Sequence, residues 1–102
     1  RAATRLASLT ALDVSRCGLT RLDGFTSLVN LTELNVSGND ALASIEQLCL
    51  CVKLTDLDVG ECALTDASLA HLRPLRRLDA LSLEGNAALT SLAKMPRLEN
   101  LT

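Results

Sequence analysis

The residues best suited to chemistry in this chain are its four cysteines and its single histidine: Cys17, Cys49, Cys51, Cys62 and His71. Cys49 and Cys51 form a Cys-x-Cys pair, and a zinc site needs further Cys or His ligands at short recurrent spacings. His71 does not have such a spacing. The sequence therefore predicts no metal site.

Catalytic groups are equally sparse. There is one histidine, no Gly-x-Ser-x-Gly motif and no glycine-rich loop that could hold a phosphate. Nothing brings a nucleophile and a base together, which is the minimum for covalent or acid–base catalysis. We expect no enzyme activity, no cofactor and no small-molecule substrate in these 102 residues.

The acidic residues are a third group of side chains that could do chemistry, and they recur at set positions of a repeated block. The pattern Leu-x-x-Leu-x-Leu/Val-x-x-Asn/Cys begins at Leu9, Leu31, Leu54 and Leu78, with starts separated by 22, 23 and 24 residues. Its fourth and sixth positions are apolar and alternate with polar residues, which indicates a short strand with one buried face. Such strands are stable only when stacked, so we predict a parallel-strand solenoid with strands centred near Leu12, Leu34, Leu57 and Leu81.

The four blocks LTALDVSRCGL, LTELNVSGNDAL, LTDLDVGECAL and LDALSLEGNAAL resemble the leucine-rich repeat family. The resemblance covers essentially residues 1–102, with Leu6 fitting the end of a preceding repeat and Leu101 opening a fifth. It implies an α/β repeat solenoid: a horseshoe segment with a concave parallel β-sheet and a convex side of irregular, 3₁₀ and short helical segments. We expect one domain of four to five repeats, cut from a longer protein because neither end carries a polar cap.

The ninth position of the blocks carries Cys17, Asn39, Cys62 and Asn86. The resemblance implies that these side chains point inward and bond turn backbone, so we interpret them as structural. Blocks one and three share one sequence style and blocks two and four another, which indicates a duplicated two-repeat unit. Cys17 and Cys62 would lie roughly 10 Å apart, too far for a disulfide. We predict four reduced cysteines, with Cys17 and Cys62 buried, and an intracellular, cytoplasmic protein.

The segments that return from one strand to the next are less regular. Between Leu19 and Leu28 the apolar residues recur every third position, which suits a 3₁₀-like return and places Phe25 in the core. The sequence TDASLAHLRPLRR predicts a helix capped by Thr65 or Asp66 that ends near Pro74. Its inward residues are Leu69 and Leu72.

The outward positions of the strands carry the candidate site. Seven of the twelve acidic residues fall there, against one of the ten basic ones, whereas Arg73, Arg76, Arg77, Lys94 and Arg97 fall on return segments. We predict an acidic concave face that binds a Lys/Arg-rich protein surface through Asp13, Glu33, Asn35, Asp56, Asp58, Glu61, Asp79, Ser82 and Glu84.

Two other functions fit the same residues. Repulsion between Glu33 and Asp56 at about 5 Å is only about 0.8 kcal/mol in water, so a purely structural spacer would tolerate these acids. The frame Cys51–Asp66 resembles a cysteine-containing repeat subclass common in F-box adaptors, which implies the substrate-recognition arm of a ubiquitin ligase. The first repeat resembles a subclass found in phosphatase regulators and ciliary proteins. A net charge of −2 and the absence of an 18-residue apolar run favour neither nucleic acid nor membrane.

Overall fold

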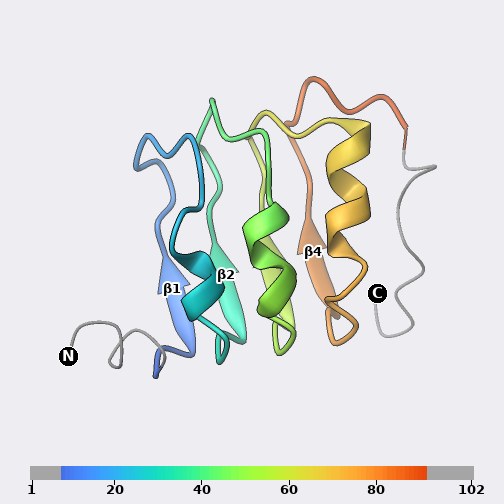
Figure 1. The fold of residues 1–102 in the computed structure, drawn as a ribbon. Coiled ribbons are helices and arrows are strands. Elements are labelled where there is room, and N and C mark those ends of the chain that lie inside the picture. The colour runs from blue at the N-terminus through green and yellow to red at the C-terminus, as the bar shows by residue number, and fades with distance from the viewer. Residues whose placement is uncertain (1–7, 92–102) are drawn as a thin grey trace.

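The described part of the chain winds through four short parallel strands that alternate with three 3₁₀ helices. The structure is a computed structural model that describes residues 8–91. Strands line one side of the molecule and helices the other, as Figure 1 shows. The elements in chain order are β1 (Ala11–Asp13), η1 (Phe25–Ser27), β2 (Glu33–Asn35), η2 (Glu46–Leu50), β3 (Asp56–Asp58), η3 (Asp66–Leu72) and β4 (Ala80–Ser82).

The strands form one parallel sheet in the order β1-β2-β3-β4. Leu12 pairs with Leu34, Leu34 with Leu57, and Leu57 with Leu81, so the same block position is in register on every strand. Sequence neighbours are therefore spatial neighbours throughout the sheet. The predicted parallel solenoid and its strand centres are confirmed.

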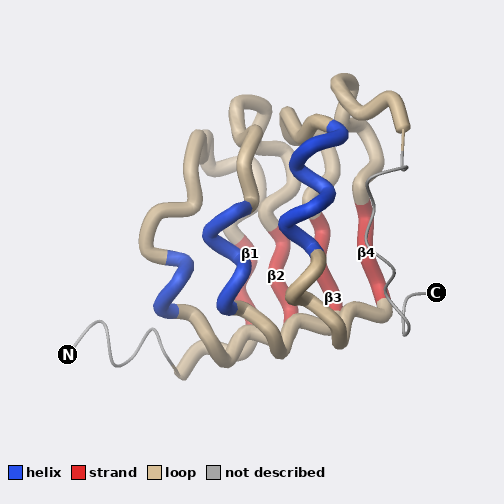
Figure 2. Tube along the Cα trace, turned by 45° about the vertical axis from the view of Figure 1, so that its right-hand side comes forward, coloured by secondary structure: helices blue, strands red, loops and turns tan. Residues whose placement is uncertain are grey.

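The convex side is built on a three-residue step of buried side chains. Leu42, Ile45, Leu48, Cys51 and Leu54 are all fully buried. A 3₁₀ helix has three residues per turn, which brings positions i and i+3 to the same face, whereas an α-helix would rotate them apart. The spacing therefore explains why the helical segments in Figure 2 are 3₁₀ rather than α.

The predicted helix after Thr65 is present as η3. The Thr65 side chain accepts a hydrogen bond from the Ser68 backbone N–H, and the Ser68 hydroxyl accepts one from the Thr65 backbone N–H. This reciprocal pair is a capping box. Leu69 and Leu72 are fully buried, as expected. The helix ends at Leu72, before Pro74.

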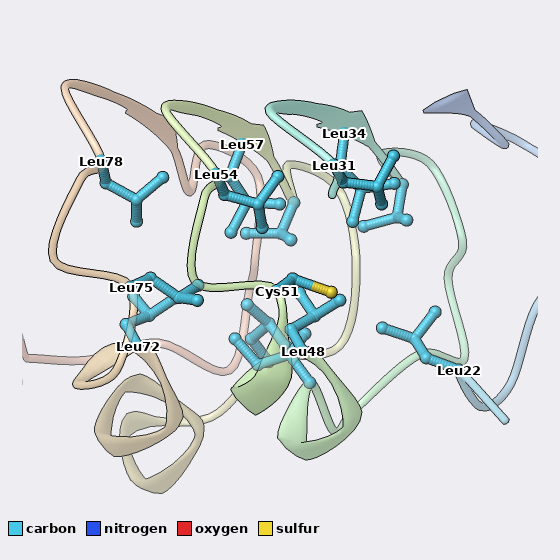
Figure 3. Close-up of a cluster of buried hydrophobic side chains, with 14 of the residues drawn as sticks. Leu22, Leu31, Leu34, Leu48, Cys51, Leu54, Leu57, Leu72, Leu75 and Leu78 are labelled. Carbon is cyan, nitrogen blue, oxygen red and sulfur yellow. The ribbon is translucent and has the colours of Figure 1, made fainter. Parts of the chain in front are cut away.

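The core is a column of leucines between the sheet and the helices, shown in Figure 3. The apolar block positions of the second and third repeats are all buried, as is Leu78. Five block residues are only partly buried, because one side of each end repeat faces no described neighbour: Leu9, Leu12, Val14, Leu81 and Leu83. The inner repeats therefore bury their block residues completely, whereas the end repeats bury most of theirs only in part. Phe25 is likewise partly buried and packs against the core.

Several expectations concern residues outside the range 8–91. These are the partial repeats at Leu6 and Leu101 and the convex positions of Lys94 and Arg97. Within that range, no helix is long and apolar enough to span a bilayer.

Candidate protein-binding face

The outward side chains of the strands form two columns across the sheet. The first column is Ala11, Glu33, Asp56 and Ala80, and the second is Asp13, Asn35, Asp58 and Ser82. Together with the strand backbone they line an open hollow of about 720 Å³. Six of the nine predicted site residues therefore lie side by side on this sheet face.

Glu33 and Asp56 face each other across neighbouring strands in the first column. Like charges directly opposite one another destabilise a sheet, and parallel strands are about 4.8 Å apart. Both residues are exposed, and the alanines that flank them in the column leave their carboxylates uncovered. The Thr55 hydroxyl lies 2.9 Å from Asp56 Oδ1 and shares its one proton between that oxygen and the Thr32 carbonyl, which orients the carboxylate without neutralising it.

The second column has a structural task that sequence reasoning missed. Oδ1 of Asp13, Asn35 and Asp58 each accepts the backbone N–H two residues further on, at 2.9 Å in all three cases. These are Asx turns that end the strands, and the spacing Asp/Asn-x-Ser/Gly in the blocks was the available signal. Hydrogen bonds from the Ser15 side chain and backbone lower the pKa of Asp13. The second column therefore presents carboxylates in fixed orientations.

A ladder of threonine side chains runs along the edge of the sheet where the strands begin. The Thr32 hydroxyl donates to the Thr10 carbonyl and the Thr55 hydroxyl to the Thr32 carbonyl, each at 3.1 Å. Asp79 takes the corresponding place before β4, where its backbone N–H donates to the Thr55 carbonyl at 2.9 Å. Asp79 thus lies at the margin of the sheet face and not within the two columns.

Beyond the upper strand ends, Glu61 and Glu84 lie with Asp58 around a second, smaller hollow of about 190 Å³. Arg16, the one basic residue among the outward positions, forms an ion pair here. Its Nη2 donates to Glu61 Oε1 at 3.1 Å. Both side chains are more than half exposed, so this pair contributes little stability. It does neutralise Glu61, so Asp58 and Glu84 supply the charge of the smaller hollow.

The ninth-position asparagines are buried connectors, as the resemblance implied. Asn39 Oδ1 accepts the backbone N–H groups of Cys17 and Leu19 at 3.1 and 2.9 Å, and its Nδ2 donates to the Val36 carbonyl at 2.6 Å. Asn86 accepts the Leu64 N–H at 3.0 Å. Its Nδ2 donates to two further carbonyls at 2.9 Å each. Each asparagine thus supplies partners for backbone groups that would otherwise be unpaired.

The two ninth-position cysteines differ in burial. Cys62 is buried as predicted and its thiol donates to the Val36 carbonyl at 3.3 Å. Cys17 is exposed, so its predicted burial was wrong. The reason is its place in the first described repeat, where no preceding described repeat covers it. Burial raises the pKa of Cys62, and burial together with the nearby Cys49 raises the pKa of Cys51 to about 11.

No group of three His, Cys, Asp or Glu side chains within residues 8–91 converges as metal ligands would. Cys49, half-buried at the end of η2, lies close enough to Cys51 to affect its pKa. The arrangement of carboxylates on rigid strands can attract and orient cationic groups. It offers no loop that could wrap a metal ion with six or more oxygens.

Comparisons with known proteins agree with this geometry. Family models described as leucine rich repeats match residues 7–50, in two copies, and residues 50–72. Leucine-rich repeat-containing protein 56 from Rattus norvegicus is 40% identical over 84 residues, and that from Homo sapiens 39%. Each match spans 81% of this chain but only 15% of the relative.

Solved structures with the same fold include two internalins from Listeria monocytogenes. The inlF internalin has a TM-score of 0.77 at 29% identity, with 96% of this chain and 30% of that chain covered. Internalin C2 has a TM-score of 0.69 at 23% identity, with 97% and 52% covered. The in-phase blocks, the parallel sheet, the buried asparagines and these matches lead to one conclusion: the chain is a member of the leucine-rich repeat family.

Proposed function

We propose that the concave sheet face binds a Lys/Arg-rich segment of a partner protein. Leucine-rich repeats generally mediate protein–protein interaction and are not typically enzymes. The observation that carries the proposal is the pair Glu33 and Asp56, which lie directly across neighbouring strands with no base in either column. A cation placed between the two carboxylates would convert their repulsion into attraction.

The expected affinity follows from the composition of the face. No aromatic side chain lies in the hollow, and small residues such as Ala11 and Ala80 surround the acids. Binding therefore depends on charge more than on a desolvated anchor, so it should be moderate and should weaken as salt screens the attraction. A reducing, intracellular location is part of the same proposal, since the buried thiols of Cys51 and Cys62 are unbridged.

Charge reversal tests the proposal directly. Peptides selected from a random display library on the wild-type chain at low salt should include basic ones, and D56K/D58K should slow their association tenfold or more. Both side chains point outward, and D58K removes one turn hydrogen bond, from the Gly60 N–H, so the variant should keep its fold at reduced stability; circular dichroism checks the fold. The matched control is D23K/E46K, which makes the same charge change at exposed positions away from the sheet. Unchanged binding by folded D56K/D58K would falsify the concave-face proposal.

The two alternatives differ in what this experiment returns. A structural spacer would yield no basic peptide that distinguishes D56K/D58K from D23K/E46K. A ubiquitin-ligase arm would instead require that a partner found through this face is ubiquitinated in cells, and that D56K/D58K abolishes the modification.

A further inference from the structure

Three equivalent turns lead from the convex side into β2, β3 and β4, along the lower edge of Figure 1. In each turn the last backbone N–H donates to the first carbonyl, at 3.3, 3.2 and 3.3 Å for turns 28–31, 51–54 and 75–78. The first and last residues of every turn are buried. The two central residues of each turn are therefore the ones at the surface: Val29, Asn30, Val52, Lys53, Arg76 and Arg77.

Of the large hydrophobic residues exposed in the described part of the chain, two lie in these turns and the third lies beside one of them. The large hydrophobic residues that are exposed within residues 8–91 are Val29 at 39%, Leu50 at 51% and Val52 at 45%. Val29 and Val52 occupy the same position of successive turns, and Leu50 immediately precedes the second turn. Scattered exposed aliphatics need no explanation, but a cluster on adjacent turns is typical of a surface that another molecule covers.

The same turns carry positive charge. Lys53, Arg76 and Arg77 are exposed, and residues 27–30, 50–53 and 74–77 contain no acid. The Lys53 Nζ donates to Asn30 Oδ1 of the preceding turn at 2.8 Å, so side chains on this edge reach from one turn to the next. Arg76 and Arg77 form no ion pair with any described residue. The sign of this edge is opposite to that of the concave face.

We propose that this turn edge, made of Val29, Leu50, Val52, Lys53, Arg76 and Arg77, docks an acidic segment of a partner protein that also carries aliphatic side chains. The order of the turns sets the order in which aliphatic and acidic residues follow one another along the bound segment. Each turn leads directly into a strand, and the turns follow the strand order, so a chain crossing them meets the two valines first and the two arginines last. Its aliphatic residues cover Val29 and Val52, and its carboxylates pair with the guanidinium groups, which favour planar bidentate contacts.

Peptide display on the full chain at low salt also tests this surface. Peptides that carry both acidic and aliphatic residues should be recovered. R76E and V52S should each weaken their binding tenfold or more. The matched control for charge is R21E, which reverses another exposed arginine outside the turns and should leave binding within twofold. Equal binding of these peptides to wild type, R76E and V52S would overturn the proposal, as would recovery of no acidic peptide.

Other occupants give distinct results. Sedimentation of the chain alone would show concentration-dependent association, lost in R76E, if a second copy covers the edge. Binding to phosphatidylserine vesicles, lost in R76E and V52S, without recovery of acidic peptides would assign the edge to a membrane surface. Either result overturns the peptide proposal. The concave variant D56K/D58K should bind the acidic peptides as well as wild type does, so failure of one proposal leaves the other measurable.

Discussion

The Cys-type repeats, which start at Leu9 and Leu54, and the Asn-type repeats, which start at Leu31 and Leu78, satisfy their turns in different ways. An Asn-type turn closes on itself: Leu42 N–H donates to the Asn39 carbonyl at 2.9 Å, and Leu89 N–H to the Asn86 carbonyl at 3.0 Å. A Cys-type turn instead donates its N–H groups to the asparagine of the next repeat. A Cys-type repeat therefore depends on an Asn-type repeat on its C-terminal side.

The eighth block position follows the same alternation. All four residues there have left-handed backbone: φ is 54° at Arg16, 74° at Gly38, 52° at Glu61 and 81° at Gly85. The glycines belong to the Asn-type repeats, and the long side chain of the preceding Cys-type repeat lies over each of them. A Cβ on Gly38 would lie 2.6 Å from Arg16 Cγ, and one on Gly85 2.9 Å from Glu61 Cγ. The two styles are thus halves of one directional unit.

Core leucines of the two repeat styles should contribute about equally to the free energy of unfolding. Leu34 of an Asn-type repeat and Leu57 of a Cys-type repeat are both 3% exposed at paired positions. Either Leu→Ala change should destabilise the protein by about 2–5 kcal/mol, as for other buried leucines. Denaturant unfolding measures both. A loss below about 1 kcal/mol at either site would contradict the register, and very unequal losses would show that the styles differ in packing as well.

The ninth position should separate the two styles sharply. Asn39→Ala removes the acceptor for two N–H groups and a donor to buried carbonyls, so we expect a loss of roughly 2–4 kcal/mol at about 1 kcal/mol per hydrogen bond. Cys62→Ala removes a weak thiol donor and a small volume, and should cost about 1 kcal/mol. Unfolding free energies from the same denaturant series compare the two.

A second measurement locates the damage. Amide hydrogen exchange in Asn39→Ala should quicken at Cys17 and Leu19, which lose their acceptor, and not at Leu42, whose N–H bonds the Asn39 backbone carbonyl. Equal protection at all three amides would mean that the directional dependence is wrong.

The sequence predicted the sheet, its register and the buried asparagines because these follow from the block and its family resemblance. It could not predict the Arg16–Glu61 pair, which joins residues from repeats two apart and depends on the missing side chain of Gly38. The burial of Cys17 was wrongly predicted because burial depends on a neighbouring repeat, not on block position. Six of the nine outward residues share the sheet face, while their role in binding stays a prediction. The Asx turns of the second column were missed because the residues were considered only as outward charges.

Thiol chemistry should distinguish the cysteines inside the core from the exposed one. With its pKa raised to about 11 from the ordinary 9.0, Cys51 should hold roughly a hundredfold less thiolate at pH 8 than an unperturbed thiol. Cys17 is exposed and should react first with a thiol reagent in the native protein, whereas Cys51 and Cys62 are buried and should react only after unfolding. Fewer than four reactive thiols in the unfolded, unreduced protein would reveal a disulfide.

The direction of the pKa shift also sets a pH dependence. A raised thiol pKa means that the unfolded chain loses its proton first, near pH 9, while the folded chain keeps it to about pH 11. The contribution of Cys51 to stability is therefore present below pH 9 and is lost as the pH rises towards 11. Cys51→Ala should flatten the fall in stability over this range relative to wild type, measured by denaturant unfolding at each pH.

The smallest net effect is expected for Glu61→Gly at the eighth position, where the sign is more informative than the size. Gly38→Ala places a Cβ on left-handed backbone and against Arg16, so it should cost about 1–2 kcal/mol from the backbone alone. Glu61→Gly makes the opposite change: it relieves left-handed backbone of similar cost but adds unfolded-state freedom worth about 0.5–1 kcal/mol and removes an exposed ion pair.

The net gain expected for Glu61→Gly is therefore about 0.5 kcal/mol. Glu61→Ala is the control, because it loses the ion pair and keeps the strained backbone, so it should be neutral or slightly destabilising. Denaturant midpoints of the two variants against wild type give the signs. If Glu61→Gly destabilised the protein more than Glu61→Ala did, left-handed backbone would not be the reason that the Asn-type repeats carry glycine, and clearance for the overlying side chain would remain as the cause.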